Sequence, residues 1–378
     1  MKLLALQWLG SLYSCKCDFR NCHEKALQSL MPQKPRIYLD HAATTPILSE
    51  ARAAMVAAMD MWANPSSAHS DGRAAKAALE DARARLAAAL DWDGEIIFTS
   101  GASEAIRMAM DTDAPLFASA VEHDAVFANL GGGVTLPVQS GGTIDIGTIK
   151  ESGRYVIQPV NSETGVIQPC DQLAAAIRAV GGIWIADCSQ SAGKLPLPDA
   201  DMIVIAGHKL GGPPGVGALL LRDLGLLRPT GGHEQGYRRG TENLPSVMGL
   251  VAAIENKSSW LDEAERLRAS LDDAIISAGG EVVAADGDRV PYIASYRMPG
   301  VSANSQVIAF DMAGISISAG SACSSGTLKA SHVMKAMGWN DTAAGEVIRV
   351  SFGPQTLESD VKGFLGVWRD IKQRAAAA

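Results

Sequence analysis

The chain has 378 residues, more than a single compact core usually holds and a suitable length for two domains. Hydrophobic residues make up 47% of it and charged residues 20%, which excludes intrinsic disorder and collagen-like repeats. The formal net charge of -8 argues against nucleic acid as the main binding partner. The sequence contains no run of 18 apolar residues, so we expect no membrane-spanning helix.

Residues 1–35 are expected to be an N-terminal extension outside the fold. Residues 1–13 are largely apolar but lack a clear signal-peptide cleavage site, so residues 1–30 are either a poorly ordered extension or precede a true start at Met31. Four metal-binding side chains are grouped here: Cys15, Cys17, Cys22 and His23. Their spacing matches no usual zinc motif, so we expect no metal site. The six scattered cysteines favour a reducing, cytoplasmic setting over a disulfide framework.

Helices and short apolar strands alternate through the next part of the chain. Ala-rich segments with helical periodicity cover residues 48–62 and 68–90, and the Asn64-Pro65-Ser66-Ser67 turn between them can cap the second helix. Apolar runs of strand length follow at 95–99, 116–118, 155–159, 183–187, 202–206 and 216–221. Such alternation predicts a doubly wound, mainly parallel sheet, which binds ligands beyond the carboxyl ends of its strands.

The last part of the chain has a different pattern. A predicted helix at 261–278 precedes strands near 292–297 and 347–352, and a final helix covers 358–373. This pattern predicts a smaller α+β domain. We therefore expect an α/β protein with a large domain of residues 48–257 and a small domain of residues 36–47 plus 258–378.

Two predicted strand ends carry a pair of charged residues. Asp187 ends the strand at 183–187, and Lys209 closely follows the strand at 202–206. A lysine amine in a pocket can form a Schiff base with an aldehyde cofactor. A nearby carboxylate can pair with a protonated pyridine nitrogen. Taken alone, however, such a pair is more often a simple ion pair.

A second segment, SAGSACSSG at residues 318–326, surrounds Cys323 with small residues, Gly and Ser. Such a segment packs little and stays mobile, and an exposed thiol within it would be unusual unless it reacts or moves. A small buried cysteine in a tight turn explains the same composition equally well.

Further stretches decide between these alternatives. They are, in chain order, YLDHAATTP, NPSSAH, IIFTSGASEA, VEHDAV, VNSETGVIQP, ADCSQSAGKLP, AGHKLGGPPGVGAL, GGHEQGYRRGTEN, SAGSACSSG and IRVSFG. With these motifs in this order, the chain from about Arg36 to its end resembles the cysteine desulfurases, a branch of the fold-type I pyridoxal-phosphate enzymes. The long cysteine segment followed by SHVMKAMG is similar to the group with a long mobile cysteine loop. That group serves iron–sulfur cluster assembly and other thiolation pathways.

The resemblance implies pyridoxal 5'-phosphate as cofactor and L-cysteine as substrate. Lys209 would hold the cofactor covalently, Asp187 would bind its pyridine nitrogen, and Gln190 would reach its ring hydroxyl. His123 would stack on the ring and move protons, a task that suits a histidine near neutral pH. Cys323 would take the substrate sulfur as a persulfide.

The resemblance also implies the contacts to phosphate and to the substrate carboxylate. Ala102 and Ser103 would hold the phosphate at a helix N-terminus, with a further donor from His208. Thr241 would reach the phosphate of a neighbouring subunit, which implies a homodimer. Arg349 would clamp the substrate carboxylate through a two-pronged contact.

Three positions depart from the family pattern. Asn161-Ser162 replaces two adjacent Asn, of which the second normally contacts cofactor and substrate. Ala206 replaces a Ser that donates to phosphate, and Pro214 replaces a Lys. A lost neutral hydrogen bond costs on the order of 1 kcal/mol, so we expect weaker binding of cofactor or substrate with the chemistry intact.

We therefore expect a cysteine desulfurase that converts L-cysteine to L-alanine and passes sulfur to an acceptor or scaffold protein of cluster assembly or thiolation. Alternatives are a selenocysteine lyase or an aminotransferase of the same fold, or a non-catalytic scaffold in a sulfur-transfer complex. The flexible setting of Cys323 argues against an aminotransferase, and the intact Lys209, Asp187 and His123 argue against a scaffold. We expect no nucleic acid and no membrane among its partners.

Overall fold

The computed structural model describes residues 36–256, 260–320 and 331–377. Residues from Tyr38 onward form one compact unit. The expectations for residues 1–35 and for Cys323 lie outside the described residues. Across the described ranges, no helix combines the length and the apolar character needed to cross a membrane.

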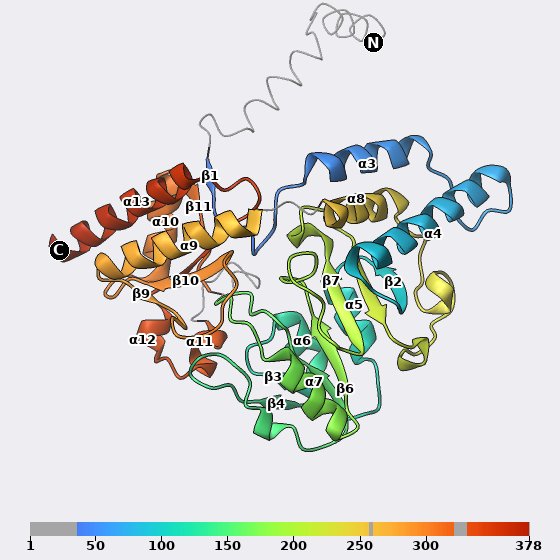
Figure 1. Ribbon diagram of the computed structural model, residues 1–378, viewed down its shortest axis with the longest axis horizontal. Helices are drawn as coiled ribbons and strands as arrows, with labels where there is room; N and C mark the ends of the chain where they lie inside the picture. Colours follow the sequence, from blue (N-terminus) through green and yellow to red (C-terminus); the bar gives the residue numbers. More distant parts are fainter. Residues whose placement is uncertain (1–35, 257–259, 321–330, 378) are drawn as a thin grey trace, which may run out of the picture. The chain divides into compact units, whose positions relative to one another are not determined.

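A mainly parallel sheet is the largest sheet of the compact unit (Figure 1). Within the described residues it has seven strands, in the order β2-β8-β7-β6-β5-β3-β4. Their bounds are β2 (Glu95–Thr99), β3 (Leu116–Ser119), β4 (Val134–Leu136), β5 (Arg154–Val156), β6 (Ile183–Asp187), β7 (Met202–Ala206) and β8 (Gly217–Leu221). All neighbouring pairs are parallel except those that β8 makes with β2 and β7. The predicted sheet is confirmed.

The apolar run at 155–159 is only partly a strand. β5 ends at Val156, and the Gln158 N–H bonds the Glu122 side chain at 3.0 Å instead of a neighbouring strand. The Ile157 N–H still bonds the Ile185 carbonyl of β6 at 3.1 Å, and Pro159 has no N–H with which to continue the ladder.

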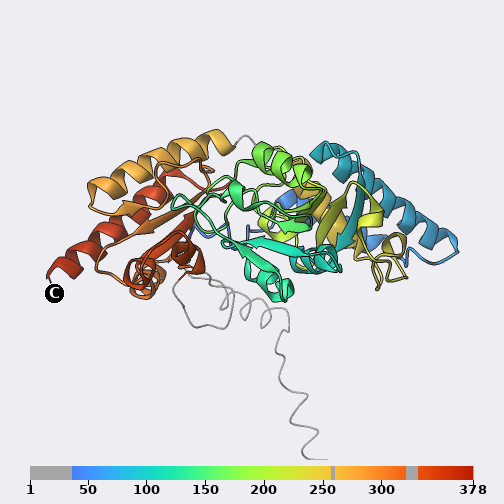
Figure 2. The same cartoon turned by 90° about the horizontal axis from the view of Figure 1, so that it is seen from below.

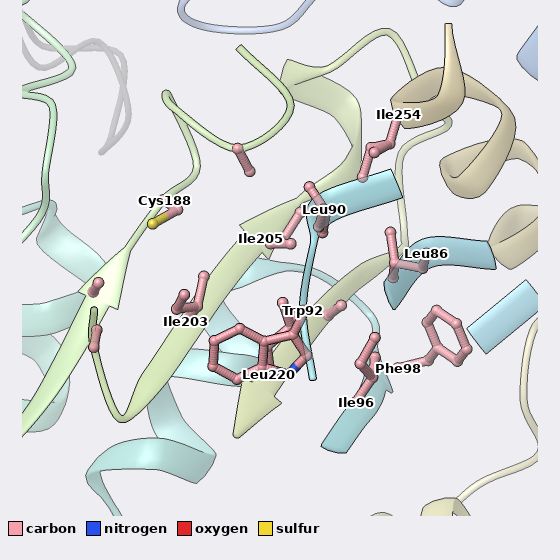
Figure 3. Packing of buried hydrophobic residues seen from close by; sticks show 14 of the residues in the cluster. Leu86, Leu90, Trp92, Ile96, Phe98, Cys188, Ile203, Ile205, Leu220 and Ile254 are labelled. Atoms are coloured by element: carbon pink, nitrogen blue, oxygen red, sulfur yellow. The ribbon is translucent and has the colours of Figure 1, made fainter. Parts of the chain in front are cut away.

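Helices cover both faces of the sheet. One face carries α4 (Ser70–Leu90), α7 (Cys170–Ala179) and α8 (Leu244–Glu255), and the other carries α5 (Ala102–Met110) and α6 (Asp124–Leu130). Successive strand residues point to opposite faces, so Ile96 and Phe98 join the apolar cluster beneath α4, α7 and α8 (Figure 3). Ile97 joins the cluster beneath α5 and α6. A sheet buried on both faces needs continuous apolar strands, which explains why they are readable in the sequence. The helix α3 (Ser49–Asp60) packs on α8.

The start of α4 differs from the expectation. The ring of His69 caps the helix by accepting a hydrogen bond from the Gly72 N–H at 3.3 Å. The predicted capping by the turn at residues 64–67 is therefore wrong. That turn instead closes on itself, because the Ser66 N–H bonds the Asn64 side chain at 2.9 Å.

A smaller antiparallel sheet follows in the order β12-β10-β9. Its strands are β9 (Glu281–Val282), β10 (Ile293–Arg297) and β12 (Val347–Ser351), and its main helices are α9 (Trp260–Ser277), α10 (Ala303–Met312) and α13 (Glu358–Ala377). The rings of Phe310 and Phe364 stack at 4.6 Å and join α10 to α13. In both views α9 and α13 lie side by side (Figures 1 and 2). This part has the predicted α+β character.

Short elements complete the described chain. They are β1 (Ile37–Tyr38), β11 (Ile315–Ser316), α11 (His332–Ala336), α12 (Asp341–Ala344) and the 3₁₀ turns η1 (Ile146–Thr148), η2 (Gly207–Lys209), η3 (Leu224–Leu226) and η4 (Glu234–Gly236). The boundaries proposed between the two domains remain a prediction.

The segment of residues 39–45 links the two sheets through backbone hydrogen bonds. Its Leu39 carbonyl accepts the N–H of Ser351 in the small sheet at 2.9 Å. Its Thr45 N–H donates to the His208 carbonyl, directly beyond β7 of the large sheet, at 2.8 Å. The ends of both sheets are thereby held at the same place, which is where the candidate site lies.

Candidate active site

A cavity of about 500 Å³ lies at the carboxyl ends of β2, β6 and β7. This is the position where open α/β sheets bind their ligands. Eight of the residues predicted for the site line it: Ala102, Ser103, His123, Ser162, Asp187, His208, Lys209 and Arg349. Residues that are far apart in the sequence therefore line the same cavity.

Lys209 reaches the cavity from η2, which directly follows the buried strand β7. The segment of residues 39–45 holds the backbone of Lys209, because the Thr45 hydroxyl donates to the Lys209 carbonyl at 3.1 Å. The same carbonyl accepts from the ammonium of Lys194 at 3.4 Å. Two contacts therefore anchor the lysine at its main chain, and its side chain lines the cavity.

Asp187 ends β6 and lines the same cavity. Its side chain is mostly buried, and Oδ1 accepts the Ser189 N–H at 3.0 Å. The hydroxyl of Ser189 also lies at the cavity and is buried without a hydrogen-bond partner among the described residues. A buried hydroxyl of this kind needs a partner, which a bound polar ligand can supply.

His123 is both the N-cap of α6 and a cavity residue. Its Nδ1 accepts the Ala125 N–H at 3.1 Å, so the neutral ring carries its proton on Nε2. Burial, and then the charge of Lys209, lower the pKa of His123. Burial and the charge of Lys209 lower the pKa of His208 as well. Both imidazoles are therefore neutral near pH 7.

The N-terminus of α5 also lines the cavity. No side chain caps this helix, so the N–H groups of its first turn are available to a ligand. Gly101 precedes it with φ 153° and ψ 178°, a conformation open essentially to glycine alone. A Cβ on Gly217 would approach the Gly101 Cα to 2.8 Å, so the loop packs closely on β8. An uncapped, fixed helix N-terminus of this kind suits a phosphate group.

Arg349 projects from β12 with a side chain that is 8% exposed. Its Nη1 donates to the Ser162 carbonyl at 3.1 Å, and its Nη2 donates to Asp40 Oδ1 at 2.9 Å. Its Nε is buried and has no hydrogen-bond partner among the described residues. The guanidinium is thus held in place and still has an unused donor.

Two predicted residues are buried beside the cavity without lining it. The Gln190 side chain donates to the Ala42 carbonyl at 2.9 Å, and its oxygen has no partner in the described structure. The Asn161 side chain accepts the N–H groups of Glu163 and Thr164 at 3.0 and 2.9 Å and donates to a backbone carbonyl. Asn161 therefore shapes a turn, and its predicted contact with substrate remains a prediction.

Thr241 does not line the cavity of its own chain. It borders a separate hollow of about 450 Å³ together with Met59 and Trp62, whose side chains are exposed. A contact to the phosphate of a second copy remains a prediction. Cys323 lies in residues 321–330, outside the described part of the chain.

The sequence analysis did not single out five ionisable residues that line the cavity, namely Glu104, Glu122, Asp124, Glu163 and His332. Burial raises the pKa of Glu122 well above its usual range, and one of its carboxyl oxygens has no partner among the described residues. Burial also raises the pKa of Glu163, whose other contacts include the Ser331 hydroxyl at 2.5 Å. His332 bonds the Glu122 carbonyl at 2.9 Å. These residues could have been found from the sequence, because they lie inside or beside the motifs that resemble the cysteine desulfurases.

These groups fit a pyridine aldehyde that carries a phosphate. The cavity offers an amine, a carboxylate, an uncapped helix N-terminus and an orphaned hydroxyl. Ala206 and Pro214 also line it, and neither side chain offers a hydrogen-bond donor. Phosphate donors within this chain would therefore come from α5 and His208.

Comparison with known proteins identifies the family. Residues 37–364 match the Aminotransferase class-V family. Curated relatives named cysteine desulfurase from Gluconacetobacter diazotrophicus and Cereibacter sphaeroides are 36% and 35% identical to the chain. These matches cover 89% and 90% of this chain, and 93% and 97% of the relatives.

Solved structures agree with this assignment. A NifS-like protein from Rickettsia africae ESF-5 superposes with a TM-score of 0.84 at 27% identity, over 90% of this chain and all of that chain. A structure of SspA in complex with cysteine superposes with a TM-score of 0.74 at 26% identity, over 85% of this chain and all of that chain. The chain therefore belongs to the class-V aminotransferases, a pyridoxal-phosphate-dependent family, and within them to the cysteine desulfurases.

Proposed function

We propose that this protein takes sulfur from free L-cysteine, with Lys209 bonded covalently to pyridoxal phosphate and Cys323 as the first sulfur acceptor. The observation that carries the proposal is the convergence of Lys209, Asp187 and Arg349 on one cavity of about 500 Å³. They come from η2, β6 and β12, so no single motif explains their meeting. The relatives named cysteine desulfurase support this chemistry over that of other enzymes with the fold.

When bound, pyridoxal phosphate supplies an electrophilic aldehyde and a ring that withdraws electrons from the substrate. Asp187 would pair with the ring nitrogen, and the first-turn N–H groups of α5 would hold the phosphate. Gln190 has one side-chain oxygen without a partner in the described structure, which suits a contact to the ring hydroxyl. Thr241 would complete the phosphate site of a second copy, so the proposed enzyme is a homodimer.

Arg349 would bind the α-carboxylate of the substrate. Its fixed guanidinium and unused Nε allow a charge-assisted contact to a carboxylate. Ser162 would lie beside the substrate, because it lines the cavity and its carbonyl holds Arg349. The amine of Lys209 would then take the α-proton. The neutral His123, with its proton on Nε2, can pass a proton to the reacting substrate.

The proposed sulfur transfer needs no further oxidant. The Cys323 thiolate attacks the sulfur of L-cysteine, and a sulfur–sulfur bond forms as the carbon–sulfur bond breaks. The electron pair of the broken bond goes to the substrate carbon, which becomes the methyl group of L-alanine after protonation. Cys323 is left as a persulfide, which an acceptor or scaffold protein of cluster assembly or thiolation would take up.

The test supplies L-cysteine to the purified holoenzyme and measures alanine and sulfide with and without a thiol reductant. We expect alanine in both cases and sulfide chiefly with the reductant, because the persulfide otherwise stays on the protein. Cys323→Ser should abolish alanine formation and leave the cofactor absorption unchanged. Normal alanine formation by this variant would contradict the persulfide step, and turnover of selenocysteine alone would favour a selenocysteine lyase.

A further inference from the structure

Arg349 forms an ion pair with a carboxylate of its own chain, at the place where a substrate carboxylate is expected. Asp40 Oδ1 accepts from Nη2 at 2.9 Å, and the two side chains are 19% and 8% exposed. The other side-chain contact of Arg349, at Nη1, is an uncharged backbone carbonyl. Asp40 is therefore the carboxylate that is in direct contact with this mostly buried guanidinium.

The contact leaves part of the guanidinium for a ligand. Nε and Nη2 share one edge of an arginine, and a carboxylate binds such an edge with both oxygens. Here Nε is buried without a partner among the described residues, whereas Asp40 already occupies Nη2. An incoming carboxylate therefore meets both an oriented arginine and the negative charge of Asp40.

Backbone pairing fixes both partners. Asp40 forms a parallel bridge with Ser351 of β12, two positions beyond Arg349. Arg349 also forms an antiparallel bridge with Ser318, whose carbonyl accepts the Arg349 N–H at 2.7 Å. Ser318 lies five positions before Cys323 in the sequence. The Asp40–Arg349 pair is thus anchored to the start of the segment that carries the proposed sulfur acceptor.

We propose that Asp40 is a positioning residue that orients Arg349 and, through its own charge, limits the affinity of the site for an α-carboxylate. This inference rests on the proposed function, in which Arg349 binds the substrate carboxylate. L-cysteine and L-alanine carry the same carboxylate, so a site without the charge of Asp40 would also retain the product more strongly. Asp40 makes no contact of its own with the substrate in this assignment.

Two substitutions separate the orienting role from the charge. Asp40→Asn keeps an oxygen that accepts from Nη2 but removes the negative charge, whereas Asp40→Ala removes both. The dissociation constant of L-alanine is measured from the change in cofactor absorption of the holoenzyme. We expect it to fall roughly threefold to tenfold in D40N, because a like charge near the ligand is lost. It should rise roughly tenfold or more in D40A, because Arg349 loses its oriented contact.

Ligand-free stability gives an independent measurement. D40N should unfold at a lower temperature than the unmodified protein, because the Arg349 charge is buried without a counter-charge. L-alanine should then raise the unfolding temperature of D40N by more than it raises that of the unmodified protein. If Asp40 had a purely structural role, its substitution would not lower the unfolding temperature and at the same time raise the affinity for L-alanine.

Asp93→Asn serves as the matched control. It removes the carboxylate of the exposed Asp93–Arg222 pair, whose atoms are 3.1 Å apart and which lies outside the cavity. It should not change the affinity for L-alanine. L-alaninamide, which lacks the carboxylate, should bind D40N and the unmodified protein equally.

If D40N and D40A weakened the binding of L-alanine equally, Asp40 would have only a structural role. If neither variant changed this binding, Asp40 would have no role in the site. Both results overturn the assignment. Failure of the unmodified holoenzyme to bind L-alanine would be a different result, since it contradicts the proposed function itself.

Discussion

A buried ion pair between Arg83 and Glu234 should stabilise the loop that carries Thr241. Glu234 lies in η4, and its side chain is 0% exposed. Its carboxylate accepts from Arg83 Nη1 at 2.9 Å, from Arg83 Nη2 at 3.1 Å and from the Phe98 N–H at 2.8 Å. The loop is thereby tied both to α4 and to β2.

Glu234→Ala would remove the acceptor of three donors, and of these only Arg83 Nη1 keeps another acceptor, the Ile96 carbonyl. Breaking a buried ion pair by removing one partner typically costs about 3–5 kcal/mol. Arg83 keeps its contact from Nε to Glu80 at 3.0 Å and that from Nη1 to the Ile96 carbonyl, so part of its charge stays compensated. We therefore expect E234A to lower the free energy of unfolding by about 3 kcal/mol, at the lower end of that range.

An exposed ion pair between α4 and α8 provides the matched control. Arg85 and Glu255 also form a two-pronged contact, at 2.8 and 2.6 Å, but their side chains are 37% and 36% exposed. Exposed pairs contribute about 0–1 kcal/mol, so E255A should cost at most about 1 kcal/mol. The two variants thus compare similar hydrogen-bond geometry at different burial.

Urea denaturation followed by tryptophan fluorescence would measure both variants. Replacing Arg83 and Glu234 together with methionine should restore most of the loss, because no charge is then left buried alone. Equal losses in E234A and E255A would refute the reasoning, since burial would then not determine the strength of the pair.

Three further outcomes follow from the site. Burial, and then the charge of Lys209, lower the pKa of Lys194 from 10.5 to about 7, so between these pH values the unfolded chain binds the extra proton and stability rises with pH. Lys194→Met should therefore be more stable than the unmodified protein near pH 6 and lose this advantage towards pH 10.5 in urea titrations; an advantage independent of pH would contradict the shift. Asp187→Asn should weaken cofactor binding roughly 10- to 100-fold in absorbance titrations of the cofactor-free protein, the range for a lost charged hydrogen bond, and unchanged affinity would argue against its place at the ring nitrogen. Gly101→Ala should lower the free energy of unfolding by about 1–3 kcal/mol in thermal unfolding, because its φ of 153° strains any other residue, and a neutral effect would show that the turn can relax.

The strands of the large sheet were predictable because their surroundings are uniform. β2, β6 and β7 have the predicted bounds, since both faces of the sheet are covered and each strand must be apolar throughout. α10 was not predicted. Its exposed Ile308 and Met312 blur the apolar periodicity that marks a helix in a sequence.

The family and the chemical types in the site were also predictable, because motifs keep reactive side chains beside recognisable turns. Lys209 and Asp187 directly follow or end predicted strands, and both line the cavity as expected from parallel-sheet geometry. His123 was expected at the site, and the structure places it on the cavity, where it also caps α6.

Only the tertiary structure decided which motif residues are available to a ligand. The side chain of Asn161 forms hydrogen bonds within a local turn, and Thr241 lies away from the cavity of its own chain. Asp40 and Arg349 are 309 positions apart and still form the pair that fixes the guanidinium. Hydrogen bonds and burial join atoms across such separations, and a sequence pattern describes only neighbours along the chain. The sequence by itself therefore determined which reactive groups the protein has, and folding determined which of them are oriented, occupied or left without a partner.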